Sequence, residues 1–162
     1  MTATEPLDAF LSALEGTAVV QALRVSRWGY AAVNGAHVFG IALLVGAMVP
    51  LNLRAFGAWQ SIPRQVLLRV LVPVAAVGLA LAVVAGLLLF SVRAREYAGI
   101  GFLQMKLALV AAGTLSALAL HRAHGFLLET ASDRRLVRHA VISMVCWPGA
   151  LICGRLIAFA GD

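Results

Sequence analysis

The sequence predicts an all-α integral membrane protein, a four-helix bundle of membrane spans preceded by an interfacial amphipathic helix. Of its 162 residues, 62% are hydrophobic and only 12% are charged, and the mean hydropathy is +0.93. A soluble domain usually carries about twice that charged fraction. Four apolar runs also reach the roughly 20 residues that a helix needs to cross a bilayer. These observations exclude an ordinary soluble fold.

The leader, residues 1–27, is predicted to lie on the membrane surface. Its apolar residues recur at the spacing of one helical face: Leu7, Phe10, Leu11 and Leu14. Gly16 and Thr17 interrupt this pattern, and we expect a second short helical segment to reach about Arg24. Such a helix lies in the plane of the interface with its apolar face toward lipid.

The remaining residues, 28–162, are predicted to form one transmembrane domain. The expected spans are 28–52, 67–90, 102–120 and 140–159. Each span carries small residues four positions apart, as at Gly78, Ala82 and Gly86. Small residues let helix backbones approach closely in lipid, so this pattern predicts a compact bundle.

Four spans place both chain ends and the 91–101 connection on one side, here called the terminal side. The 53–66 and 121–139 loops lie on the other, the loop side. The span ends carry seven arginines on the loop side and four on the terminal side: Arg54, Arg64, Arg69, Arg122, Arg134, Arg135 and Arg138 against Arg24, Arg27, Arg93 and Arg95. This bias predicts a cytoplasmic loop side.

The net charge of +6 and the isoelectric point near 10.7 are also typical of nucleic-acid-binding proteins. No soluble segment here interleaves basic and aromatic residues, however. The arginines instead lie between apolar runs, where anionic lipid headgroups would meet them. We therefore expect the lipid bilayer as a partner, and no nucleic acid.

Polar residues follow one stripe of the first span. Tyr30, Asn34 and His37 are spaced so that their side chains share a helical face. Helical rise places Asn34 about 9 Å and His37 about 14 Å from the terminal-side end of the span. Ionisable groups at this depth are costly and usually functional, so His37 is the leading candidate for a ligand-binding residue.

Two cations join these groups on the terminal side. Lys106 and Arg155 each lie about 6 Å inside their spans. None of the seven acidic residues lies within a span, and Glu96 is the nearest in sequence. Either the two cations extend to lipid headgroups, or they bind an anionic ligand that enters from the terminal side.

Haem b has the chemistry that these residues would bind. Lys106 and Arg155 would hold its two carboxylates, and His37 would be an axial ligand of the iron, with Asn34 or a carbonyl orienting the ring. No second axial ligand is apparent at that depth. A quinone is the alternative cofactor, with His37 bonded to one carbonyl.

The predicted function is therefore a membrane subunit that binds haem b or a quinone in a redox or electron-transfer role. Its partner would be a redox subunit or a second copy of the chain. The alternative is a transporter subunit or assembly factor that binds an anionic solute or lipid at the same cations. No nucleophile–base pair or carboxylate dyad is present, so no catalytic residue is assigned.

Three further histidines gather on the loop side: His121, His124 and His139. Three imidazoles are a typical ligand set for Zn²⁺ or copper. Alternatively, they are ordinary interfacial histidines beside Arg122 and Arg138. Both interpretations stay open at this point.

The order of motifs resembles a family of small four-span bacterial membrane proteins, a domain of unknown function. The matching pieces are Trp28-Gly-Tyr30, Asn34-x-x-His37-x-x-Gly40, Asn52-Leu-Arg54-x-x-Gly57, Phe102-x-x-x-Lys106 and Gly154-Arg155-x-Ile157-Ala-Phe. The family pattern has an acidic residue where this chain carries Asn52. The resemblance implies a bacterial inner membrane and no established activity. A looser similarity, a histidine followed by glycines in a first span, links the chain to copper-resistance-type and b-type cytochrome membrane subunits.

Overall fold

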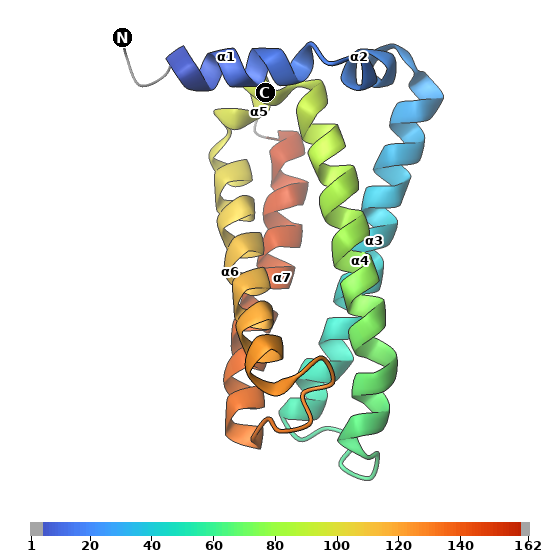
Figure 1. The fold of residues 1–162 in the computed structure, drawn as a ribbon, viewed down its shortest axis with the longest axis vertical. Coiled ribbons are helices and arrows are strands. Elements are labelled where there is room, and N and C mark those ends of the chain that lie inside the picture. The colour runs from blue at the N-terminus through green and yellow to red at the C-terminus, as the bar shows by residue number, and fades with distance from the viewer. Residues whose placement is uncertain (1–4, 160–162) are drawn as a thin grey trace.

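The computed structural model describes residues 5–159 and confirms an all-α fold, with helices and no strand in this range. Four long helices stand side by side as a bundle (Figure 1). They are α3 (Arg27–Ala55), α4 (Arg64–Val92), α6 (Gly101–His124) and α7 (Asp133–Leu156). All four are long and apolar enough to cross a membrane. Each of them overlaps one of the four predicted spans, and α7 begins before its predicted span and ends at Leu156, three residues short of it.

The leader forms α1 (Glu5–Glu15) and α2 (Ala18–Val25), which lie across the terminal end of the bundle (Figure 1). The predicted interruption at Gly16 and Thr17 is the break between them. The α2 residues Val20 and Leu23 are buried against Val92 of α4, which fastens the leader to the bundle.

Two short elements complete the terminal end: α5 (Ala94–Ala98) and the 3₁₀ helix η1 (Ile157–Phe159). The sequence predicted a loop over 91–101. Five residues are too few for a helical repeat to show in the sequence, so α5 had no periodic signal.

Close backbone contact joins α3 to α4 where two glycines face each other. A Cβ added at Gly40 would lie 2.6 Å from the Ala82 nitrogen, and one added at Gly78 would lie 2.6 Å from the Leu44 nitrogen. Only glycine fits at such a crossing, as expected from the small residues along these spans. On the other pair of helices, Gly113 of α6 faces Cys146 and Trp147 of α7.

The bundle is therefore two helical hairpins, α3–α4 and α6–α7, which meet chiefly through α3 and α7. A buried hydrogen bond of 2.9 Å from Asn52 Nδ2 to Ser143 Oγ crosses the α3–α7 contact. Leu44, Ala47, Ala75 and Trp147 form an apolar cluster near mid-bundle. A second apolar cluster lies on the loop side, and most of its members line the cavity described next: Leu68, Val72, Leu120, Leu128 and Leu136.

Candidate ligand-binding site

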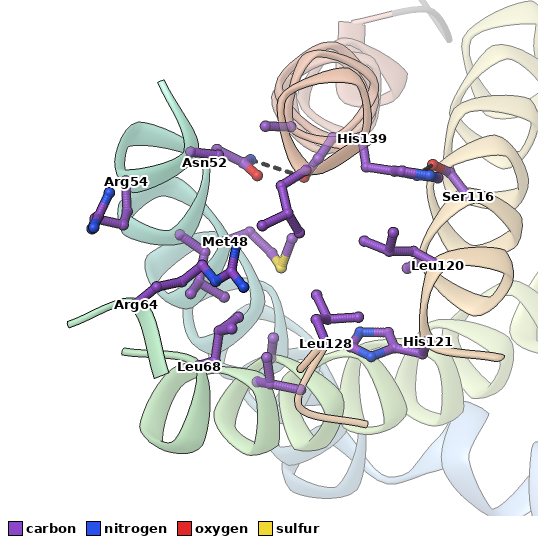
Figure 2. Close-up of a pocket in the computed structure, with 18 of the residues that line it drawn as sticks. Met48, Asn52, Arg54, Arg64, Leu68, Ser116, Leu120, His121, Leu128 and His139 are labelled. Atoms are coloured by element: carbon purple, nitrogen blue, oxygen red, sulfur yellow. Dashed lines mark hydrogen bonds between the residues drawn. The ribbon is translucent and has the colours of Figure 1, made fainter. Parts of the chain in front are cut away.

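A cavity of about 930 Å³, here called the loop-side cavity, lies between α3, α4, α6 and α7 (Figure 2). It follows α3 from Leu44 to Ala55, a depth of about 16 Å at the helical rise. Pockets of roughly 300–1,000 Å³ with mostly apolar walls are typical of small-molecule sites. The cavity therefore has the size of a ligand site within one half of the bundle.

Apolar side chains from all four long helices and from the loop between α6 and α7 form most of the wall. Figure 2 shows Met48 and Leu120 turned toward the same space. Gly125, at φ +77°, lets the chain turn sharply after α6. Leu128 then packs inward and is only 5% exposed. The loop after α6 therefore forms part of the cavity wall.

Polar groups interrupt this wall at a few positions. Ser116 of α6 and His139 of α7 share a hydrogen bond of 2.7 Å, and Asn52 donates to Ser143 as described above. Gln65 differs from these, because its Oε1 is buried without a hydrogen-bond partner among residues 5–159. Leaving a buried acceptor unpaired costs about 1–3 kcal/mol. A ligand that drew the Gln65 amide toward the cavity and paired with it would recover that cost.

The rim of the cavity is cationic. Arg54 Nε donates to the Ile62 carbonyl at 3.3 Å, and Arg64 pairs with Asp133 at 2.9 Å. His121 stacks at a tilt on Phe126, with ring centroids 5.9 Å apart. Asp133 offsets the charge of Arg64, so these lining residues leave one net positive charge, that of Arg54.

The three loop-side histidines do not come together. His139 is bonded to Ser116, whereas His124 contacts Thr130 and Arg135, each at 2.9 Å. Only His121 and His139 line the cavity. Within residues 5–159, no three His, Cys, Asp or Glu side chains are close enough to hold a metal ion together. The structure therefore gives the alternative metal site no shared ligand set.

His37 lies on the terminal half of α3, against α4. Its Nδ1 is 2.7 Å from the Ala82 carbonyl oxygen, and its ring fills the space left by Gly86, where an added Cβ would lie 2.9 Å from Cε1. A carbonyl oxygen only accepts, so Nδ1 carries the proton and Nε2 keeps its lone pair in the neutral ring. A backbone carbonyl therefore orients the His37 ring. The sequence predicted that either Asn34 or a carbonyl would do so.

The other predicted residues are spread around the bundle. Asn34 is exposed, and no hydrogen bond joins it to His37 in the described chain. Lys106 is half-buried, its Nζ 3.2 Å from where a Gly154 Cβ would stand. Arg155 is exposed, its guanidinium carbon 5.3 Å from the Phe159 ring centroid. The expected convergence on one cavity is not seen in either cavity described here, because neither is lined by these residues or by His37.

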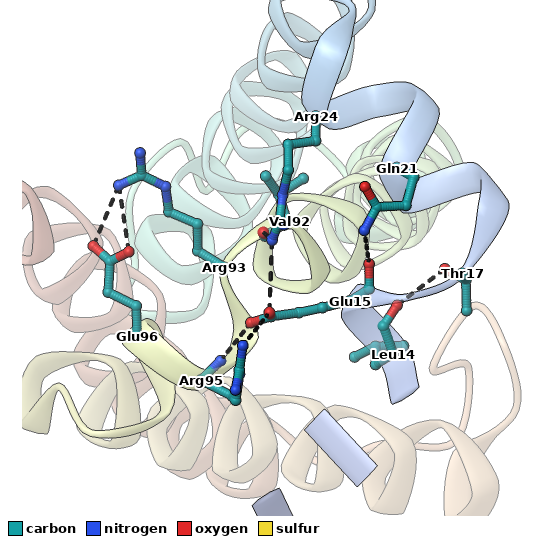
Figure 3. Close-up of polar contacts among 9 residues, drawn as sticks. All are labelled: Leu14, Glu15, Thr17, Gln21, Arg24, Val92, Arg93, Arg95 and Glu96. Atoms are coloured by element: carbon teal, nitrogen blue, oxygen red, sulfur yellow. Dashed lines mark hydrogen bonds and ion pairs between the residues drawn. The ribbon is translucent and has the colours of Figure 1, made fainter. Parts of the chain in front are cut away.

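Tyr30, by contrast, lines a second cavity of about 1040 Å³, here called the terminal-side cavity. It lies under the leader, and its polar lining residues are Glu15, Arg24, Tyr30, Arg93, Arg95, Glu96 and Tyr97. Figure 3 shows the Glu15 carboxylate between Arg24 and Arg95.

Glu15 supplies a carboxylate whose role the sequence did not predict. It is 8% exposed and accepts hydrogen bonds from the Arg95 backbone N–H at 3.0 Å and from Arg95 Nη2 at 3.4 Å. The Arg95 backbone N–H is the main reason that the pKa of Glu15 falls below its ordinary 4.5; burial opposes this, and the charges of Arg95 and Arg24 add to it. Glu96, the nearest acid in sequence, pairs instead with Arg93 at 3.3 Å.

The residues of the loop-side cavity gave little signal in the sequence. Gln65 falls just before the predicted 67–90 span, and serines such as Ser116 and Ser143 are common in membrane helices because they can bond to their own backbone. In the sequence, Asn52 stands out only as a departure from a family motif. Comparison of the chain with protein-family models, curated proteins and solved structures finds no match.

Proposed function

We propose that this chain is a membrane subunit that binds a lipid-soluble quinone in the loop-side cavity, in a redox or electron-transfer role. A quinone combines a flat ring bearing two oxygens with an apolar tail. The cavity offers mostly apolar walls, a few hydrogen-bonding groups and a position within the membrane-spanning part of the bundle. Sites for such ligands need few polar groups, placed to fix orientation.

The observation that carries the proposal is the buried, unpaired amide oxygen of Gln65. A quinone carbonyl requires a donor, whereas the hydroxyl of the reduced quinol also offers a proton to an acceptor. A side-chain amide meets either need, because a flip exchanges its N–H₂ and its oxygen. The Ser116–His139 pair has the same property, since either member can donate. Both redox forms can therefore be bound at the same wall.

The test compares Gln65→Leu with the matched substitution Gln104→Leu. Gln104 is exposed on α6 and bonds the Ala98 carbonyl, and it lies outside the cavity. Each protein is purified gently from quinone-replete membranes, and its quinone is extracted and counted per polypeptide. We expect Gln65→Leu to retain about two- to tenfold less quinone, the effect of one hydrogen bond.

Stability separates a binding effect from a folding effect. Gln65→Leu removes a buried, unpaired acceptor, so its thermal midpoint in detergent should equal or exceed that of the wild type. Wild-type quinone content in Gln65→Leu, or equal loss in Gln104→Leu, would contradict the assignment of the cavity.

A second candidate is haem b bound at His37, favoured by the hydrogen bond from Nδ1 to the Ala82 carbonyl. Metal-bound histidines usually donate their other ring N–H to such an acceptor, which fixes the tautomer and the ring plane. We expect purified protein to show a Soret band that shifts on reduction, and His37→Ala to lack it while remaining folded. Haem retained in His37→Ala would move the ligand elsewhere.

Purified protein that carries neither haem nor quinone would contradict both redox proposals. The non-redox function would then remain, with Lys106 and Arg155 binding an anionic solute or lipid. Lys106 and Arg155 have different neighbours, Gly154 and Phe159. This separation supports the non-redox function less well than the loop-side cavity supports quinone binding.

A further inference from the structure

The terminal-side cavity has an excess of positive charge that the neighbouring carboxylates do not cancel. Three arginines and two glutamates line it, which leaves one net positive charge. A guanidinium has five N–H donors. Within the described residues, the side chain of Arg95 donates only through Nη2 and that of Arg93 only through Nη1. The cavity is therefore rich in donors as well as in charge.

Two phenols add neutral donors to the same cavity. Tyr30 comes from α3 and Tyr97 from α5, and neither hydroxyl makes a hydrogen bond within residues 5–159. Burial and the neighbouring Tyr30 raise the pKa of Tyr97, so its phenol stays protonated and able to donate. Guanidinium and phenol groups together are suited to the oxygens of a phosphate.

The position of the cavity indicates that this phosphate is attached to apolar chains. It lies where the spans end, between the crosswise leader and α4, and Leu89 and Val92 contribute to its lining (Figures 1 and 3). Val25 and Trp28 follow the lining residue Arg24 in sequence, and they are 82% and 83% exposed. Aromatic residues at span ends mark the level of lipid headgroups. A molecule held here has its polar part in the cavity and its apolar part among the helices.

We propose that the terminal-side cavity binds the phosphodiester headgroup of an anionic phospholipid, with Arg93, Arg95 and Tyr97 as its main donors. Basic pockets between membrane helices bind anionic lipid headgroups. The Glu15 contacts hold Arg24 and Arg95 in place. The bound lipid would connect the leader, α3 and α5. This inference does not depend on the ligand of the loop-side cavity.

The experiment uses native mass spectrometry of the full chain released from micelles that contain equal amounts of phosphatidylglycerol and phosphatidylcholine. Wild-type protein should retain phosphatidylglycerol in preference. Arg93→Gln should retain about fivefold less of it, the effect of one lost charge. Arg93 is a mild site to change, because its described partner is the exposed Glu96. Tyr97→Phe is a second, uncharged variant that should also lose the lipid in part.

The matched control is Arg69→Gln, which makes the same charge change on an exposed α4 residue at the loop side. It should retain lipid as the wild type does. Equal retention of phosphatidylcholine, unchanged retention in both cavity variants, or equal loss in Arg69→Gln would overturn the proposal. Displacement of the lipid by an equal concentration of inorganic phosphate would show that the cavity binds free phosphate instead, and would overturn the lipid assignment.

Discussion

The glycines at the α3–α4 crossing illustrate how single residues decide the packing of this bundle. Gly40 and Gly78 lie against the backbone of the opposite helix, whereas nothing lies within 4 Å of a Cβ added at Gly35. All three residues belong to similar apolar stretches. Their effect on stability therefore depends on the neighbouring helix and not on helix propensity alone.

We expect Gly40→Ala to destabilise the bundle by about 1–3 kcal/mol, because the new methyl group would force two backbones apart. Gly35→Ala is the control and should be neutral or stabilising by up to about 1 kcal/mol, since alanine is the better helix former. Reversible unfolding of both variants in mixed detergent measures the difference. Equal stability of the two would show that the α3–α4 crossing is looser than described.

Sequence periodicity predicted which face of α3 carries polar groups but not what those groups contact. His37 lies one turn from Gly40, where α4 is still close enough for its Nδ1 to reach the Ala82 carbonyl. Asn34 lies about 9 Å from Gly40 along the axis, and helices diverge with distance from a crossing. The same stripe therefore supplies one half-buried and one exposed polar residue.

At the scale of elements, the leader depends on a contact between residues 80 positions apart. Glu15, the last residue of α1, accepts a hydrogen bond from the Arg95 backbone N–H in α5. The sequence predicted the two leader helices from their apolar spacing and their break. It could not predict this contact, because a charged residue at the end of an amphipathic helix ordinarily faces water.

The attachment of the leader should weaken in acid. The pKa of Glu15 is lower in the folded protein than its ordinary 4.5, so its stabilising contribution is complete above pH 4.5 and is lost as the pH falls through the folded value. We expect hydrogen exchange at the Arg95 amide, corrected for its intrinsic pH dependence, to accelerate over that range.

Glu15→Gln should show the faster exchange already at neutral pH and lack the acid transition. Glu129→Gln, a change at an exposed position on the loop side, should behave as the wild type. An acid transition that persists in Glu15→Gln would assign it to another group.

At the scale of the whole molecule, the four apolar runs and the small-residue faces predicted the architecture. They did not reveal which helices would pair. The loop-side cavity exists because α3 pairs with α4 and α6 with α7, and because α3 meets α7. Gln65, Ser116 and Ser143 are on three different helices, so no local pattern relates them. The loop-side cavity therefore could not be predicted from the sequence alone.

The orientation in the membrane is a prediction at the same scale. We expect an inner-membrane protein with the loop side in the cytoplasm, because the loop side carries seven of the eleven arginines counted above. Reporters fused after residues 60 and 130 should both report the cytoplasm, and one fused after residue 162 the opposite compartment. Different compartments for the two loop fusions would contradict the topology.

The pairing of adjacent helices has a consequence for how the protein is made. α3 and α4 are joined by a short connection, and their crossing at Gly40 and Gly78 uses no residue beyond α4. Everything that this hairpin needs is therefore synthesised before α6, and we expect it to form before the second hairpin is complete, since chains generally fold from the N-terminus during synthesis. In that order of folding, the second hairpin docks on the first, and Ser143 of α7 accepts the hydrogen bond from Asn52 of α3 as it does so. The loop-side cavity is completed last, by the final third of the chain.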